Sequence, residues 1–155
     1  MKKKFIIIPV VLIFLGIFLY SSFKSVKPQQ VDNAPNWVKI EDAFVQAAAS
    51  DKLILVDVYE VGCKYCRAME RDVYPDTTVR VVLDEGYIPV KVNGNSEELI
   101  TINGVKVTEQ AFAQSNGAFV FPTVLILNSK GELLRKRTGY MGVDDLRRFL
   151  YRSES

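Results

Sequence analysis

Histidine is absent from the 155-residue sequence, and cysteine occurs only at Cys63 and Cys66. A structural zinc site needs four ligands, usually cysteine and histidine, so this chain cannot complete one alone. A c-type haem needs histidine directly after Cys-x-x-Cys, where this chain has Arg67. A cysteine hydrolase needs a base such as histidine beside its nucleophile. A two-thiolate copper carrier stays possible, although it would be unusual without methionine or histidine placed nearby.

Acidic residues are missing from the first 30 positions, which hold five lysines. Positions 31–155 therefore carry 15 basic and 18 acidic residues, a net charge of −3. A mildly acidic body without a basic stripe argues against nucleic acid as a partner.

The longest apolar run, residues 5–20, follows three lysines. As a helix this run would rise about 24 Å, and residues 21–23 extend it toward the thickness of a membrane core. The pattern predicts that residues 1–24 are an uncleaved anchor in the inner membrane, inserted through residues 5–23. A cleaved signal sequence is the alternative. Because the lysines stay inside, either reading places the rest of the chain in the periplasm or another extracytoplasmic space.

The polar segment 25–36, with two prolines, is predicted to be a tether, and residues 37–155 a single domain. Helical patterns occupy residues 41–50, 63–73, 76–84, 108–117 and 143–152. Strand-like runs occupy residues 53–59 and 87–93, a hairpin around Asn103-Gly104 within 99–107, and two strands within 123–139. This order predicts an α/β fold with a mixed sheet and helices on both faces. In the first helix we expect Ile40, Phe44, Ala47 and Ala48 on the inner face.

The predicted strand 53–59 ends in a short turn, and Cys63 begins the following helix. Helix starts and Cys-x-x-Cys motifs lower a thiol pKa from about 8.5 into the range of roughly 3.5–7.5, and Lys64 adds a positive charge. Cys66, one turn on, is expected to be shielded. The pattern favours reversible disulfide chemistry, in which Cys63 attacks and Cys66 resolves. A plain structural disulfide is the alternative, but closing so small a loop stabilises little.

With these features the sequence resembles the thioredoxin superfamily over residues 37–152. "LILVDVYEVGCKYC" is similar to the family's strand, turn and helix, with Asp57 at the position of a buried acid. Lys91 in "VKVN" corresponds to a lysine near that acid, "VFPTVLIL" to the cis-proline stretch, and Gly139 to a glycine before the last helix. The resemblance implies a thioredoxin-like fold with no cofactor and no metal.

The resemblance also implies a set of site residues. The implied catalytic residues are Cys63, Cys66, Asp57 and Lys91, with Cys63 and Cys66 forming the disulfide. The implied substrate-binding residues are Lys64, Tyr65, Phe121 and Pro122. We expect Arg67, Met69 and Glu70 on the helix surface or rim.

Two departures from ordinary thioredoxins refine the expectation. The motif reads Gly62-Cys63-Lys64-Tyr65-Cys66, without the family's tryptophan and without the histidine that makes a pair oxidising. The insertion 94–117 and "CRAMERDVYPD" look more like periplasmic SoxW-like reductases. The resemblance implies a thiol–disulfide reductase for exported proteins, supplied with electrons by a membrane transporter of the DsbD or CcdA type. A disulfide oxidase or isomerase of the same fold and a redox-inert binding module remain alternatives.

Overall fold

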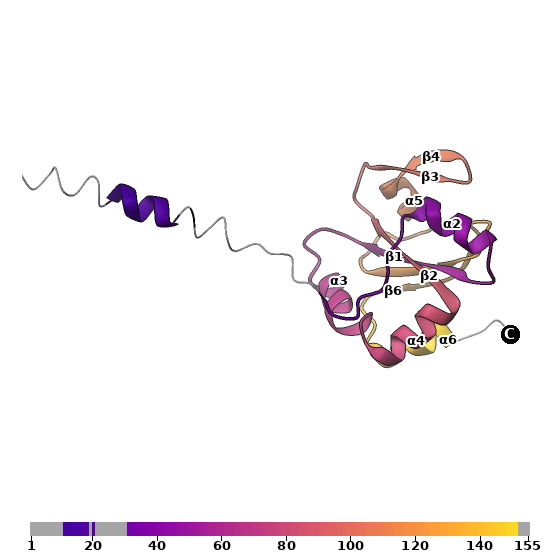
Figure 1. The fold of residues 1–155 in the computed structure, drawn as a ribbon. Helices are drawn as coiled ribbons and strands as arrows, with labels where there is room; N and C mark the ends of the chain where they lie inside the picture. The colour runs from indigo at the N-terminus through magenta and orange to yellow at the C-terminus, as the bar shows by residue number, and fades with distance from the viewer. Residues whose placement is uncertain (1–10, 19, 21–30, 152–155) are drawn as a thin grey trace, which may run out of the picture. The chain divides into compact units, whose positions relative to one another are not determined.

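The computed structural model describes residues 11–18, 20 and 31–151 (Figure 1). Residues 11–18 and 20 are helical and exposed, and they belong to a unit, residues 1–30, that is separate from residues 31–155. Within the described part of the chain, no helix is both long and apolar enough to cross a membrane. About half of the predicted insertion 5–23 and half of the tether 25–36 lie outside the described residues.

Four strands form the central sheet, in the order β2-β1-β5-β6. β1 (Leu53–Tyr59) runs parallel to β2 (Tyr87–Asn93) and antiparallel to β5 (Thr123–Leu127), which pairs antiparallel with β6 (Leu133–Thr138). The two central strands, β1 and β5, come from short apolar runs and are almost wholly buried. The predicted mixed sheet is therefore confirmed.

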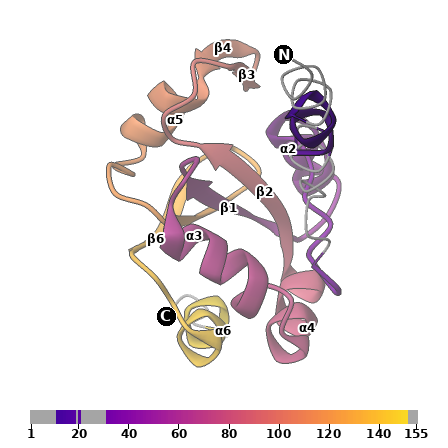
Figure 2. The same ribbon diagram turned by 90° about the vertical axis from the view of Figure 1, so that its left-hand side faces the viewer.

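Two layers cover the sheet. Helices α2 (Ile40–Ala48) and α5 (Glu109–Ser115) and the hairpin β3 (Leu99–Ile102) with β4 (Val105–Thr108) lie on one side, the α2 face. Helices α3 (Lys64–Ala68), η1 (Met69–Val73), α4 (Thr77–Gly86) and α6 (Val143–Tyr151) lie on the other, the α3 face. Figures 1 and 2 both show this division, with α3, α4 and α6 opposite α2, α5 and the hairpin.

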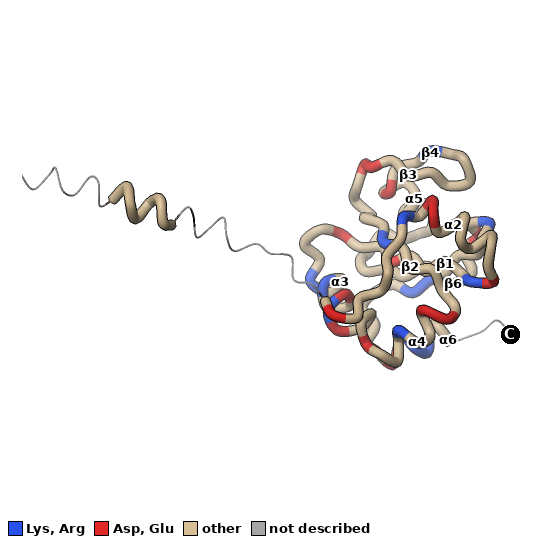
Figure 3. Tube along the Cα trace, in the orientation of Figure 1, with Lys and Arg blue, Asp and Glu red and all other residues tan. Residues whose placement is uncertain are grey.

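Alternation along β1 divides its side chains between the two faces. Ile54, Val56 and Val58 join the core of the α2 face, and Leu55 joins that of the α3 face. Successive side chains of a strand point to opposite sides, so Asp57 points to the α3 face with Leu55. Basic and acidic positions are interspersed along residues 31–151 (Figure 3).

Local signals in the sequence explain several element boundaries. Asp76 accepts hydrogen bonds from the backbone N–H groups of Thr78 and Val79 and so caps α4, as predicted. The predicted hairpin forms with Asn103 and Gly104 at positive φ in its turn.

Two expectations about helix faces are wrong. Ala48 is exposed, and Ala43 takes its place inside because positions 40, 43, 44 and 47 share one side of a helix. Met69 is wholly buried instead of lying at the surface or rim. It follows the buried Cys66 by three residues and therefore shares the inner side of its helix.

Candidate active site

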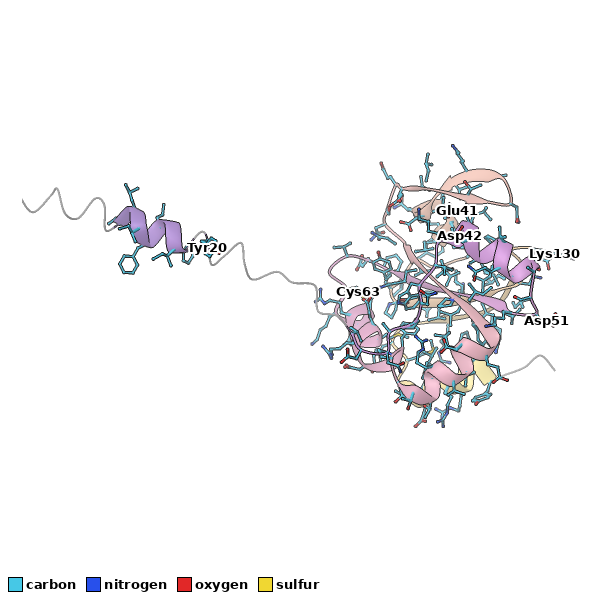
Figure 4. All side chains as sticks on the ribbon, in the orientation of Figure 1. Tyr20, Glu41, Asp42, Asp51, Cys63 and Lys130 are labelled. Carbon is cyan, nitrogen blue, oxygen red and sulfur yellow. A yellow bond between two sulfur atoms is a disulfide. The ribbon has the colours of Figure 1, made fainter. Side chains whose placement is uncertain are left out.

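The turn between β1 and α3 places Cys63 at the start of a helix (Figure 4). Gly62 has φ +90°, a backbone conformation that favours glycine, and the Cys63 N–H donates to the Glu60 carbonyl at 3.3 Å. Cys63 is the N-cap of α3, and its Sγ accepts a hydrogen bond of 3.0 Å from the Cys66 N–H. The predicted helix-start position of Cys63 is confirmed.

Cys63 and Cys66 form a disulfide, with their Cα atoms 5.3 Å apart. The two sulfur-bearing residues differ in accessibility: Cys63 is half-buried, whereas Cys66 is only 5% exposed. Lys64 and Tyr65, between them, are both exposed, and the Tyr65 ring lies 6.2 Å from that of Tyr140. A partner's sulfur can therefore approach Cys63 more easily than Cys66.

Asp57 lies on β1 beneath the helices of the α3 face and is 1% exposed. Burial raises the pKa of Asp57 from 3.8 to about 7, against smaller lowering effects of Lys91 and the Tyr74 hydroxyl; Glu70 raises it slightly. A carboxyl group with a pKa near neutrality can accept and release a proton at physiological pH.

Lys91 of β2 is the direct partner of Asp57 in the register between β1 and β2. The sequence resemblance implied a lysine close to the acid at this position. The Nζ of Lys91, however, lies 2.7 Å from Glu70 Oε1. The same Nζ lies 4.7 Å from the centre of the Tyr59 ring and 5.5 Å from that of Trp37. Lys91 thus forms an ion pair with Glu70 and also acts electrostatically on the buried Asp57.

Phe121 and Pro122 lie beside the carboxyl end of β1, because Val58 pairs with Thr123. The Phe121–Pro122 peptide bond is cis, Pro122 is buried and Phe121 is half-buried. The Gly139 N–H donates to the Pro122 carbonyl at 2.8 Å. A Cβ atom on Gly94 would overlap the Phe121 ring, so this glycine leaves room for the aromatic side chain.

Two residues that act on Asp57, Glu70 and Tyr74, were not among the predicted site residues. Nor was Trp37, whose ring lies near Tyr74 and Lys91. Glu70 follows Cys66 by four residues, a helical spacing that could have placed both on neighbouring parts of one face. Tyr74 and Trp37 pack edge to face with ring centres 5.1 Å apart. Nothing local marks this pair, because the two residues lie on segments far apart in the sequence.

Across residues 11–18, 20 and 31–151, no cluster of three or more cysteine, histidine or acidic side chains could hold an ion.

The fold and the disulfide define a thioredoxin-like domain with a Cys-x-x-Cys centre. The thioredoxin-like domain family matches residues 40–152, and the chain belongs to this family. No curated protein sequence is similar enough to count as a match. The fold and the Cys63–Cys66 disulfide of this chain are consistent with a thiol–disulfide oxidoreductase, although the family is not specific for one activity.

Solved structures share the fold at low sequence identity. A thioredoxin from Thermus thermophilus has a TM-score of 0.60 at 21% identity, covering 76% of this chain and 85% of its own. The DsbD C-terminal domain of Neisseria meningitidis, in its oxidised form, has a TM-score of 0.55 at 21% identity, covering 70% and 87%. A thioredoxin-fold protein from Helicobacter pylori has a TM-score of 0.55 at 22% identity, covering 64% and 67%.

Proposed function

We propose that the protein is a membrane-anchored thiol–disulfide reductase of the SoxW-like kind that acts outside the cytoplasm. The observation that carries the proposal is the asymmetry of the disulfide: Cys63 is half-buried and Cys66 is 5% exposed. A reductase needs one sulfur that meets the partner and a second that waits behind it. The buried Asp57 on the same face supplies a proton acceptor for the second sulfur.

The reaction starts from the reduced protein. The Cys63 thiolate attacks one sulfur of a partner's disulfide, and the partner's other sulfur leaves as a thiolate that takes up a proton. Cys66 then loses its proton to the Asp57 carboxylate and attacks Cys63. The bond between Cys63 and the partner breaks, and the partner leaves with two thiols while the 63–66 disulfide forms.

The helix start supports Cys63 as the attacking group. The N–H of Cys66 already donates to Cys63 Sγ at 3.0 Å, and the same donor would stabilise the Cys63 thiolate after reduction. The positive end of the helix dipole acts in the same direction.

The direction of the reaction is argued from the residues between the cysteines. Lys64 and Tyr65 replace the histidine-containing pair that makes related proteins oxidising, which favours reduction of partners. The oxidised protein must then be reduced again, and we propose a membrane thiol transporter of the DsbD or CcdA type as the source of electrons. The apolar run 5–20 behind three lysines supports the anchor and the extracytoplasmic side.

The reduction potential of the 63–66 pair tests the direction. Full-length protein is equilibrated with mixtures of reduced and oxidised glutathione, quenched, and its free thiols are alkylated and counted. A potential near about −270 mV supports a reductase, and one near about −120 mV supports an oxidase or isomerase instead.

Trapping of partners in cells tests the chemistry and the compartment. The Cys66→Ser variant retains attack through Cys63 but cannot release the partner, so exported proteins should accumulate as mixed disulfides. The matched control is the double variant Cys63→Ser with Cys66→Ser, which should trap none. If Cys66→Ser also traps none, the redox-inert binding module replaces the reductase; trapped cytoplasmic proteins would contradict the extracytoplasmic location.

A further inference from the structure

The α3 face contains two buried polar atoms that lack a hydrogen-bond partner among the described residues: Asp57 Oδ1 and the Tyr74 hydroxyl oxygen. Asp57 is 1% exposed and Tyr74 0%. Buried polar groups in proteins are almost always hydrogen-bonded, so two unsatisfied ones in one core require an explanation. The Tyr74 hydroxyl is near enough to lower the pKa of Asp57, although the pair does not form a regular hydrogen bond.

The fold brings Tyr74 to this position by a wide helical turn. Its N–H donates to the Met69 carbonyl, five residues back, at 2.9 Å, at the end of the π-helical segment η1. The ring then lies in the core of the α3 face, edge to face with Trp37. Burial raises the pKa of Tyr74 well above its usual value, with Asp57 and Glu70 adding to the effect, so the hydroxyl keeps its proton.

We propose that Tyr74 is a positioning residue for Asp57: its hydroxyl donates a hydrogen bond to the Asp57 carboxylate when that group ionises, and so determines how readily the carboxylate takes the proton of Cys66. This inference rests on the proposed function, in which Asp57 is the proton acceptor.

The protonated and ionised forms of Asp57 require different hydrogen-bond partners. A protonated carboxyl group bears its own O–H, whereas a buried carboxylate needs donors for its oxygens. Lys91, the cation on the neighbouring strand, is held 2.7 Å from Glu70 Oε1. The Tyr74 hydroxyl is a neutral donor in the same core, buried and without a hydrogen-bond partner among the described residues.

The other titratable groups around Asp57 come from each neighbouring element. Lys91 of β2 lowers the pKa of Asp57, and Glu70 of η1 raises it. Tyr59 lies two residues along β1. Cys66 of α3 is in the disulfide and titrates only in the reduced protein. β5 pairs with Asp57 through Val124 and offers no titratable side chain. Removing the Tyr74 hydroxyl therefore changes a hydrogen bond without changing any charge.

The step in question is the transfer of one proton. The Cys66 S–H bond breaks, and Asp57 gains the proton. The Cys66 thiolate then attacks Cys63 Sγ in the mixed disulfide, and the bond from Cys63 to the partner breaks with the partner's sulfur leaving as a thiolate. A hydrogen bond from Tyr74 stabilises the carboxylate before the transfer. It therefore makes Asp57 ionise at lower pH and widens the pH range in which it can act as a base.

The test compares Tyr74→Phe with wild type in the full-length oxidised protein. The carboxyl carbons of aspartate are labelled with carbon-13 and titrated by NMR, and Asp57 is assigned by the signal missing from Asp57→Asn. We expect the midpoint near pH 7 in wild type and about one pH unit higher in Tyr74→Phe, a tenfold change in the ionisation equilibrium. Tyr59→Phe, which loses a hydroxyl from the same strand as Asp57, is the matched control and should keep the wild-type midpoint.

A second measurement needs no variant at Tyr74. In wild type labelled at the tyrosine ring carbon that bears the hydroxyl, the Tyr74 signal should shift with the same midpoint as Asp57. A Tyr74 signal that stays constant through the Asp57 titration, or a Tyr74→Phe midpoint equal to that of wild type, overturns the inference.

The kinetics of resolution separate this inference from the proposed function. The release of a partner from its mixed disulfide with Cys63 is followed against pH. Asp57→Asn should remove the pH step near neutrality, and Tyr74→Phe should move it to higher pH. If Asp57→Asn leaves the step in place, the proposed role of Asp57 fails; if only Tyr74→Phe leaves it unmoved, the role of Asp57 stands and that of Tyr74 fails.

Discussion

Each face of the sheet buries a polar side chain, Thr123 on the α2 face and Asp57 on the α3 face, and the two differ in their hydrogen bonding. Thr123 is 0% exposed, and by its position in β5 it points to the α2 face. Its hydroxyl donates to the Val120 carbonyl at 2.6 Å and lies 3.1 Å from the Thr138 hydroxyl. Asp57, on the α3 face, is 1% exposed and has an oxygen without a partner in the described part of the chain.

The different hydrogen bonding of Thr123 and Asp57 indicates a structural role for the first and a chemical role for the second. A buried polar group with its hydrogen bonds made, such as Thr123, contributes to stability and stays in one state. A buried acid with incomplete pairing is destabilised as an anion and can change its protonation state near pH 7. We therefore expect changes on the α2 face to alter stability alone, and changes on the α3 face to alter stability, pH dependence and disulfide exchange.

The largest effect is expected from Cys63→Ser. Without the accessible sulfur the protein cannot form a mixed disulfide, so turnover of a protein disulfide should be lost completely while the fold is retained. Turnover is measured by counting thiols released from the partner, and the fold by circular dichroism. Cys66→Ser should keep the first attack; release of thiols by Cys63→Ser at the wild-type rate would contradict the assignment.

Leu125→Ala tests the α2 face. Leu125 is 0% exposed in the core of that face, and replacing a buried leucine by alanine lowers the free energy of unfolding by about 2–5 kcal/mol. Urea denaturation of the oxidised protein measures this loss. The folded variant should exchange disulfides at the wild-type rate, and a change in its exchange rate with an unchanged fold would break the distinction between the faces.

Asp57→Asn tests the α3 face through pH. The pKa of Asp57 is about 7 when folded and 3.8 as its ordinary value, so the folded protein holds this proton more tightly than the unfolded chain. The contribution of Asp57 to the free energy of unfolding is therefore most favourable below pH 4. It falls by up to about 4 kcal/mol as the pH rises toward 7 and above. Asp57→Asn should be more stable than wild type at pH 8 and similar at pH 4.

Urea denaturation at several pH values, with oxidised protein throughout, measures this difference. A constant difference between Asp57→Asn and wild type from pH 4 to pH 8 would mean that Asp57 does not titrate in this range.

The smallest effect is expected from Thr123→Val. This change removes the hydroxyl that bonds to Val120 and Thr138 and should lower the free energy of unfolding by about 1 kcal/mol. Since Thr123 does not titrate, the loss should be the same at pH 4 and pH 8. A loss that follows the pH dependence seen for Asp57 would show that the two faces are coupled.

Most of the fold followed from local patterns. The runs 53–59 and 87–93 became β1 and β2 with unchanged bounds, because apolar β-branched residues between polar turns suit buried strands. Asp76 marked a helix start through its own capping bonds. Local patterns gave the wrong burial for Ala48 and Met69, because tertiary packing determines which side of a helix is covered.

The site was predictable only in part. Spacing placed Cys63 and Cys66, and the resemblance suggested Asp57 and Lys91. The contacts of Lys91 with Glu70 and of Tyr74 with Trp37 were not foreseeable, since each joins segments that are separated in the sequence.

The sequence by itself determined the strands, the helix starts and the neighbouring cysteines, because these depend on side chains within a few residues of one another. The tertiary structure alone decided which groups surround the buried Asp57: desolvation disfavours its charge, and the neighbouring cation Lys91 is also paired with Glu70. The reason is physical: the free energy of a buried charge depends on every group packed around it, and the groups that act on Asp57 come from β2, from η1 and from Tyr74 directly after η1.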